Sequence, residues 1–118
     1  MFKYFKVLLA LIVCVTFAVS KIEPQAIVDS FSSPGTEPRG LAWDGEYLWC
    51  VDAGIDSVYK LDPSNGMIVS SFPFSIDLSY GGITWDDDTT IWIANGSNVY
   101  KVDPTTGQSL SYFHCVYG

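Results

Sequence analysis

Three clusters in the sequence carry residue types that could do chemistry, and the first is acidic. Asp86, Asp87 and Asp88 are consecutive, and carboxylate oxygens are preferred ligands of hard cations such as Ca²⁺. The cluster lacks the ligand spacing of an EF-hand loop, and consecutive acids are also typical of a solvated turn. We therefore keep these three residues as weak metal candidates, prefer the solvated turn, and expect no cofactor.

The second cluster joins the one histidine of the chain to a thiol. His114 directly precedes Cys115, and catalysis by such a pair requires the base to hydrogen-bond with the nucleophile. Neighbouring residues of a strand point to opposite faces of a sheet, so this spacing does not favour a catalytic pair. We predict no catalytic residue, and the sequence leans away from an enzyme.

The third cluster, Asn95-Gly96-Ser97, matches the acceptor pattern for N-glycosylation. The same Asn-Gly pair is a strong signal for a hairpin turn of type I′. The sequence therefore predicts a turn here, and leaves open whether Asn95 carries a sugar.

The elements that position these clusters come from an internal repeat. Phe31, Phe72 and Phe113 are evenly spaced along the chain, and the segment from Gly40 to Phe72 is repeated with small changes from Gly82 to Phe113. The equivalent residues include Trp43 and Trp85, Trp49 and Trp92, Tyr59 and Tyr100, the turns Asp62-Pro63 and Asp103-Pro104, and the glycines Gly66 and Gly107. A period of about 40–45 residues with four short strands is typical of propeller blades.

Alternating apolar and polar residues predict four short strands in each copy and no helix after the N-terminal segment. The Asp-Pro-x-x-Gly segments predict turns in which Pro fixes φ and Gly takes a positive φ. Ala26–Phe31 is expected to be a ninth strand, equivalent to the last strand of a blade whose other three strands are absent. The eight strands expected in the two copies are Gly40–Trp43, Tyr47–Val51, Ser57–Leu61, Met67–Phe72, Ile83–Trp85, Thr90–Ala94, Asn98–Val102 and Gln108–Phe113.

The N-terminus has the pattern of a secretory signal. Lys3 and Lys6 precede the uncharged run Val7–Val19, and small residues lead up to Ser20. The run is short for a membrane span, which requires about 20 apolar residues, although an uncleaved anchor stays an alternative. We expect a secreted or periplasmic protein that meets a membrane only through this segment if it is uncleaved.

The charge excludes nucleic acid as a main partner. The chain has six Lys and Arg against thirteen Asp and Glu, and two of the basic residues, Lys3 and Lys6, precede Ser20. Cleavage after Ser20 would leave four basic side chains against all thirteen acids, a net charge of −9. Binding to a phosphate backbone depends on clustered Lys and Arg, and no basic stripe exists in this sequence.

Two cysteines would remain after cleavage, Cys50 and Cys115. In an exported protein such a pair invites a disulfide. Cys50, however, lies in an apolar strand at the place where the second copy has Ile93, which is typical of a small core residue. We therefore favour free thiols over a bridge.

Several motifs resemble blades of exported β-propellers. They are the Gly-hydrophobic-x-Trp-Asp start, the hydrophobic-Trp-hydrophobic strand, the Tyr-Lys-hydrophobic-Asp-Pro-x-x-Gly turn and the closing Phe, and together they cover Ala26 to Phe113. They are similar to blades of the virginiamycin B lyase, NHL-repeat and glutaminyl cyclotransferase families. The repeat and this resemblance together imply an all-β fold of two four-stranded antiparallel propeller blades plus one leading strand, and the N-terminal pattern predicts a signal-peptide helix before it. The catalytic groups of those families lie on loops around a central channel, spread over more blades, so no catalytic residue is carried over.

The expected organisation follows from the signal, the repeat and this resemblance. The segments are a signal peptide at 1–20, a linker with the leading strand at 21–38, blade 1 at 39–73, blade 2 at 74–113 and an irregular tail at 114–118.

Two blades are fewer than the about 4–8 of a closed propeller. The favoured interpretation is a truncated piece of a longer propeller, acting as a non-catalytic binding or interaction module. The alternatives are a fragment of a propeller enzyme of lyase or cyclotransferase type, a two-blade protomer that assembles with copies of itself into a ring, and a lone incomplete arc. The expected partners are copies of the chain, the missing blades, or a protein, glycan or small ligand.

Overall fold

The computed structural model describes residues 26–87 and 89–116. The chain divides into two units, Met1–Ser30 and Phe31–Gly118, and the fold described below belongs to the second unit. The expected signal segment and its helix lie outside the described residues. The described part of the chain contains no helix that is long and apolar enough to cross a membrane.

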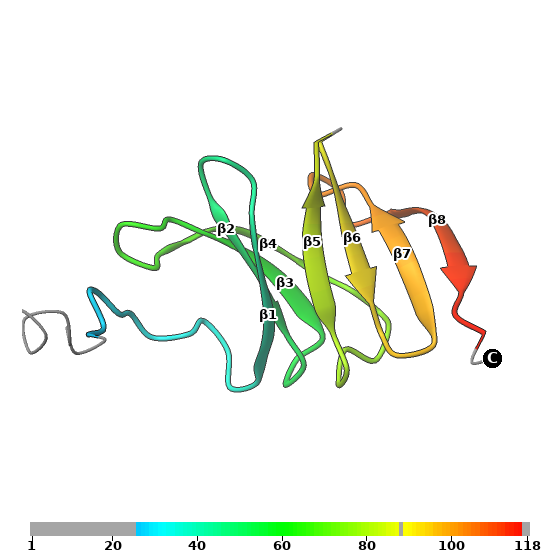
Figure 1. The fold of residues 1–118 in the computed structure, drawn as a ribbon, viewed down its shortest axis with the longest axis horizontal. Helices are drawn as coiled ribbons and strands as arrows, with labels where there is room; N and C mark the ends of the chain where they lie inside the picture. Colours follow the sequence, from blue (N-terminus) through cyan, green and yellow to red (C-terminus); the bar gives the residue numbers. More distant parts are fainter. Residues whose placement is uncertain (1–25, 88, 117–118) are drawn as a thin grey trace, which may run out of the picture. The chain divides into compact units, whose positions relative to one another are not determined.

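Eight strands form two separate four-stranded antiparallel sheets, as the repeat predicts (Figure 1). We refer to the first sheet as blade 1 and to the second as blade 2. In each blade the strands are paired in sequence order, β1-β2-β3-β4 and β5-β6-β7-β8. The strands of blade 1 are β1 Pro38–Trp43, β2 Leu48–Asp52, β3 Ser57–Leu61 and β4 Ile68–Pro73. Those of blade 2 are β5 Gly82–Asp86, β6 Thr90–Ala94, β7 Asn98–Val102 and β8 Ser109–His114.

The two faces of each sheet are set by the period of two along a strand. In β2, Trp49 and Val51 point to the face that packs on blade 2, whereas Cys50 points to the opposite face. The main core lies between the blades, with β1 beside β5. Its buried members are Ala42, Trp49, Val51, Val58, Phe72, Phe74, Leu78, Ile91, Ile93 and Val102.

The Asp-Pro turns have the predicted geometry. Asp62 accepts a hydrogen bond at Oδ1 from the Ser64 N–H at 2.8 Å, and Asp103 accepts the equivalent bond from the Thr105 N–H at 2.8 Å. Gly107 closes its turn with φ of +73°, a region that is readily open only to glycine. The carboxylates thus satisfy backbone donors of both the β3–β4 and the β7–β8 turns.

The predicted type I′ turn at Asn95-Gly96-Ser97 is wrong in detail. A hairpin is present, because the Asn95 N–H donates to the Asn98 carbonyl at 3.1 Å. Gly96 has φ of +91°, but Ser97 does not have a positive φ. Type I′ needs positive φ at both central residues, whereas type II′ needs it only at the first, so the φ signs are those of type II′.

The expected ninth strand is not formed: residues 26–33 have no strand structure. The reason is that an extended segment becomes a strand only when a neighbour accepts its backbone hydrogen bonds, and both sheets already have their own fourth strand. The segment Ala26–Phe31 has the sequence of a fourth strand without a third strand beside it.

The tail that was expected to be irregular from 114 onward differs from the prediction at His114, while residues 115 and 116 have no strand structure and 117–118 lie outside the described residues. His114 belongs to β8 and pairs with Asn98, as Pro73 in β4 pairs with Ser57. The Cys115 N–H then donates to the Ser97 carbonyl at 2.7 Å, matching the 2.8 Å bond from the Phe74 N–H to the Asp56 carbonyl. The chain therefore leaves blade 2 in the same way as it leaves blade 1.

Candidate binding surfaces

The junction between the two blades shows which side chains a blade needs in order to be covered. The indole rings of Trp49 and Trp85 stack across the junction with centroids 6.0 Å apart and an interplanar angle of 17°. At its outer end the ring of Phe72 lies against Gly107, where an added Cβ would come within 2.7 Å of the ring. Phe74 packs edge-on against Tyr100 at 5.7 Å. The two blades are therefore joined by several aromatic contacts.

Blade 1 has a second face that corresponds to the covered face of blade 2. We call it the leading face, and it consists of Leu41, Trp43, Cys50, Tyr59 and Leu61. Cys50, Tyr59 and Leu61 are buried in a small cluster of their own, but Leu41 is 63% exposed and Trp43 is 51% exposed. Their counterparts in blade 2, Ile83 and Trp85, are packed against the main core. The leading face is thus an apolar blade surface without a covering blade in the described structure.

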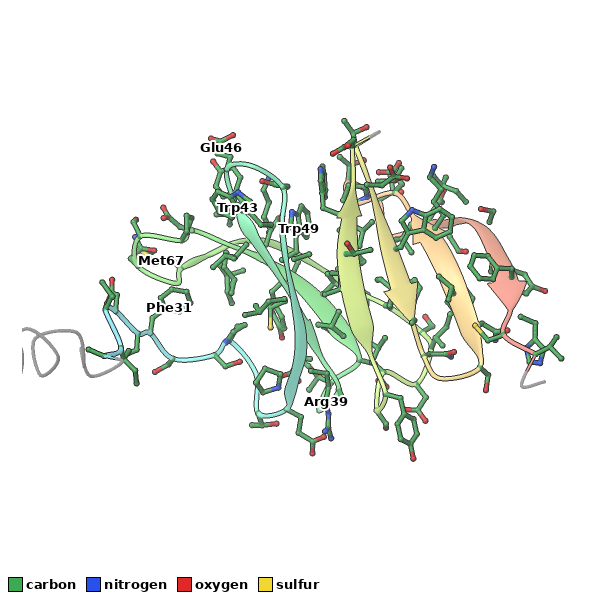
Figure 2. The ribbon with its side chains drawn as sticks, viewed as in Figure 1. Phe31, Arg39, Trp43, Glu46, Trp49 and Met67 are labelled. Carbon is green, nitrogen blue, oxygen red and sulfur yellow. The ribbon has the colours of Figure 1, made fainter. Side chains whose placement is uncertain are left out.

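Phe31 forms the rim of the leading face. Figure 2 shows it below the turn that carries Met67, and its ring lies against Gly66 so closely that a Cβ there would overlap it. Phe72 lies against Gly107 in the same way, and both of these residues stand one repeat further along the chain than Phe31 and Gly66 do. A hollow of about 460 Å³ adjoins it, and its lining includes Phe31, Leu41, Cys50 and Leu61.

Blade 2 has a corresponding open face at the other end, which we call the trailing face. Trp92, Val99 and Phe113 occupy the positions that Trp49, Val58 and Phe72 have in blade 1. The Trp92 and Phe113 rings are in tilted contact with centroids 6.1 Å apart. Phe113 is 54% exposed, whereas Phe72 is 8% exposed under blade 2. The trailing face therefore has the residue types of a covered blade face.

Each blade also contains one Asp–Trp–Lys arrangement. The Trp49 indole N–H donates to Asp44 Oδ2 at 2.8 Å, and the Trp92 indole N–H donates to Asp86 Oδ2 at 2.9 Å. The Lys60 ammonium lies 5.4 Å from the Trp49 ring. Lys101 lies at the same distance, 5.4 Å, from Trp92 and 3.3 Å from Asp86 Oδ2.

Both lysines belong to the repeated Tyr-Lys-hydrophobic-Asp-Pro motif, but the motif alone did not predict their contacts with the tryptophans. Burial raises the pKa of Asp44, but hydrogen bonds from the Tyr47 N–H, the Trp49 indole and the Glu46 N–H outweigh burial, and the net pKa is lowered. Asp44 is therefore a turn cap and an indole acceptor, which are structural duties.

A groove of about 680 Å³ runs along the blade junction. Trp49 and Trp85 line it, together with charged groups from both blades, namely Asp44, Lys60 and Asp103. Mixed charge and aromatic surface suit a polar ligand with an apolar face. The charged groups Asp44 and Asp103 are already engaged by backbone donors.

Two of the three residues of the acidic cluster, Asp86 and Asp87, belong to the described structure. Asp86 is held by Trp92 and Lys101, Asp87 is exposed, and Asp88 lies outside the described residues. In residues 26–87 and 89–116, no three His, Cys, Asp or Glu side chains are grouped as metal ligands would be. Asp86 therefore has the role that Asp44 has in the first copy.

The remaining candidate residues are His114 with its neighbour Cys115 at the end of blade 2, and Cys50 in β2 of blade 1. His114 Nδ1 lies 2.8 Å from Asn98 Oδ1, on the exposed end of β8. Cys50 and Cys115 are both free, and Cys50 is buried. Burial first, and then the charge of Asp52, raises the pKa of the Cys50 thiol, so Cys50 is an unreactive core residue rather than a nucleophile.

Comparison with solved structures places this fold among propeller-type proteins. A luciferin-regenerating enzyme is similar with a TM-score of 0.51 and 23% identity, over 67% of this chain and 30% of that one. The computationally designed Ika4 protein is similar with a TM-score of 0.51 and 17% identity, over 71% of this chain and 53% of that one. No family model and no curated protein matches the sequence. The chain has the fold of part of a β-propeller, and it spans about a third to a half of the length of these two proteins.

Proposed function

We propose that the chain is an exported, non-catalytic segment of a β-propeller that binds a protein partner through its incomplete blade faces. The observation that carries the proposal is a contrast between the two copies of the repeat. Trp85 of the second copy is stacked on Trp49, whereas its counterpart in the first copy, Trp43, is half exposed. Contiguous exposed apolar surface on a folded domain marks an interaction site. The partner is then a protein surface with the apolar side chains of a blade.

The non-catalytic part of the proposal is supported by the duties of the polar residues. Asp44 and Asp86 accept indole N–H groups, and Asp62 and Asp103 cap turns. These carboxylates are used to build the two blades. Export is supported by the basic start and the apolar run within Met1–Ser20.

A second candidate is head-to-tail association of copies, and one observation favours it. The leading face has the residue types of the covered side of blade 2, and the trailing face has those of the covering side of blade 1. Heterologous contacts of this kind close into rings when the rotation between copies allows it. This candidate differs from the first in the identity of the partner, not in the surfaces used.

The surfaces are tested by removing their apolar side chains. The double variant Leu41→Thr, Trp43→Gln is expected to bind at least threefold less of an apolar fluorescent dye than the unmodified protein does. The matched control is Ile55→Thr, because Ile55 is 61% exposed in the β2–β3 hairpin, outside both faces. Equal dye binding by the double variant and the unmodified protein, with the fold intact by circular dichroism, would overturn the proposal.

A further inference from the structure

We propose that Ala26–Phe31 is a donor strand: it supplies the fourth strand to a three-stranded blade of another polypeptide and holds that blade against the leading face of blade 1. This inference rests on the proposed function, because it names the partner of the leading face. The partner is then an antiparallel three-stranded sheet with one free outer edge.

The sequence of the segment is that of a fourth strand. Ala26–Phe31 reads AIVDSF, and Met67–Phe72, which contains most of β4, reads MIVSSF. The two segments are identical at four of their six positions, and they lie one full repeat apart in the chain. No other part of the described chain before β1 has a strand pattern.

The position of Phe31 is also that of a fourth-strand residue. Phe72 lies near the end of the fourth strand of blade 1 and packs against Gly107 of the following blade. Phe31 lies against Gly66 of blade 1 in the same way. Phe31 therefore stands where the fourth strand of a blade preceding blade 1 would place its phenylalanine, and the leading face already has this one residue of its missing neighbour.

The rest of the segment lies outside the described strands. Ile27 is 86% exposed and Val28 is 99% exposed, and residues 26–31 belong to none of the eight described strands. The Ser30 N–H donates to Oδ1 of its neighbour Asp29 at 2.8 Å. The exposed β-branched side chains of Ile27 and Val28 are suited to a strand that pairs with the open edge of a sheet, as in β-strand addition. The backbone bonds would give affinity, and Phe31 would fix the register.

The internal junction defines the face that the partner needs. Blade 1 covers blade 2 with Ala42, Trp49, Val51 and Val58 from its first three strands and with Phe72 from its fourth. A partner on the leading face needs equivalents of the first four residues only, because Phe31 takes the fifth place. A second copy of this chain is a poorer fit, since Phe113 of its own β8 would compete with Phe31 for the place at Gly66.

Peptides from blade 2 provide a probe for this geometry. The peptide of residues 74–107 contains β5, β6 and β7 without β8, and it carries Thr84, Trp92, Ala94 and Val99 at the positions of the covering face. The peptide of residues 74–114 is the same with its own fourth strand added. Titration calorimetry of the full chain with each peptide, and hydrogen exchange of the complexes, are the measurements.

The full chain is expected to bind the three-stranded peptide one to one, at least tenfold more tightly than the four-stranded peptide, with new exchange protection at residues 27–31. In the Phe31→Ala variant the three-stranded peptide should bind at least tenfold more weakly. The same variant should bind the four-stranded peptide at least as tightly as the unmodified chain does, because Phe113 can then reach Gly66. Ile55→Thr is the control and should leave both affinities unchanged.

Equal affinity for the two peptides, binding without protection of residues 27–31, or no binding of either peptide would each overturn the donor-strand inference. If dye binding still depends on Leu41 and Trp43 in that case, the proposed function stands and only its partner is wrong. Loss of that dependence would overturn the proposed function itself.

Discussion

Trp49 of blade 1 and Trp85 of blade 2 stack with their ring centroids 6.0 Å apart, and this contact joins the two sheets. Trp49 also donates its indole N–H to Asp44, so the same side chain is fixed within its own blade and against the next. Substitutions at this junction therefore test how the two blades are held together.

Trp85 and Trp43 occupy the same position in the two copies of the repeat, and their replacement should have unequal effects on stability. Trp85→Ala removes the stacked partner of Trp49 and is expected to lower the free energy of unfolding by about 2–4 kcal/mol. Trp43→Ala changes the equivalent residue, which is half exposed, and should cost less than about 1 kcal/mol. Urea denaturation of both variants gives the comparison. Equal losses would mean that the blades do not pack through this pair.

The glycine beneath Phe72 should tolerate no side chain. Gly107→Ala introduces a Cβ at φ of +73° and within 2.7 Å of the Phe72 ring, so strain and crowding act together. Gly45→Ala is the matched control, because Gly45 has φ of +101° but nothing within 4 Å of an added Cβ. We expect Gly107→Ala to lower the melting temperature by several degrees more than Gly45→Ala, for a difference of about 1–2 kcal/mol. A control that is equally destabilised would show that backbone strain alone is responsible.

The stability should fall in acid partly through Asp44. Its pKa is lowered in the folded protein, where hydrogen bonds from the Tyr47 N–H, the Trp49 indole and the Glu46 N–H outweigh the opposing effect of burial. A lowered folded pKa gives stability that is present above the unfolded pKa, about 3.9, and is lost as the pH falls through the folded value. Asp44→Asn should therefore be less stable than the unmodified protein at pH 6 by about 1 kcal/mol.

The difference between the Asp44→Asn variant and the unmodified protein should shrink as the pH is lowered below about 4. Chemical denaturation at a series of pH values measures it, with Asp29→Asn on an exposed segment as the control. A difference that stays constant between pH 6 and pH 3 would contradict the role given to the Asp44 carboxylate.

The two described thiols should react at very different rates. Cys50 is 2% exposed and its pKa is raised by burial and by Asp52, whereas Cys115 is partly exposed near the end of the chain. Alkylation of the native protein followed by mass spectrometry should modify Cys115 at least tenfold faster than Cys50. Protection should disappear in denaturant. Recovery of a disulfide-linked peptide containing both residues would contradict the free state of the thiols.

The export signal is tested by the mass of the recovered protein. If Met1–Ser20 is a signal peptide, protein collected from outside the cytoplasm should begin at Lys21. Intact-mass measurement and N-terminal peptide mapping identify the first residue. Protein that stays in the cytoplasm with its N-terminus intact would contradict the export part of the proposed function.

Much of the fold could be predicted from the repeat, because the signals were local. The eight strands begin and end close to their expected bounds, and the Asp62 and Asp103 turns have the expected side-chain caps. The residue types of turns and the alternation of strands are encoded within a few neighbouring positions, so both can be predicted without knowledge of the tertiary structure.

The errors arose where structure depends on a partner strand or on exact register. Ala26–Phe31 has the sequence of a strand, but among the described residues no third strand pairs with it, so the local pattern could not decide its state. His114 extends β8 beyond Phe113, and the Cys115 N–H then donates to the Ser97 carbonyl. This pairing depends on backbone groups, and the side chains after Phe72 and Phe113 are too different to predict it. The Asp44–Trp49 and Asp86–Trp92 bonds depend on turns of different length, so identical roles were hidden behind unequal spacing.

The most direct test of the central claim is the solution mass of the exported protein by light scattering, together with its binding of an apolar dye. We predict a monomer that binds the dye strongly, and loss of that binding in the Leu41→Thr, Trp43→Gln variant. This result means that the leading face is open and awaits a partner other than a copy of the chain. A discrete assembly with a total of about 4–8 blades and no dye binding would contradict the account, because copies of the chain would then cover both faces.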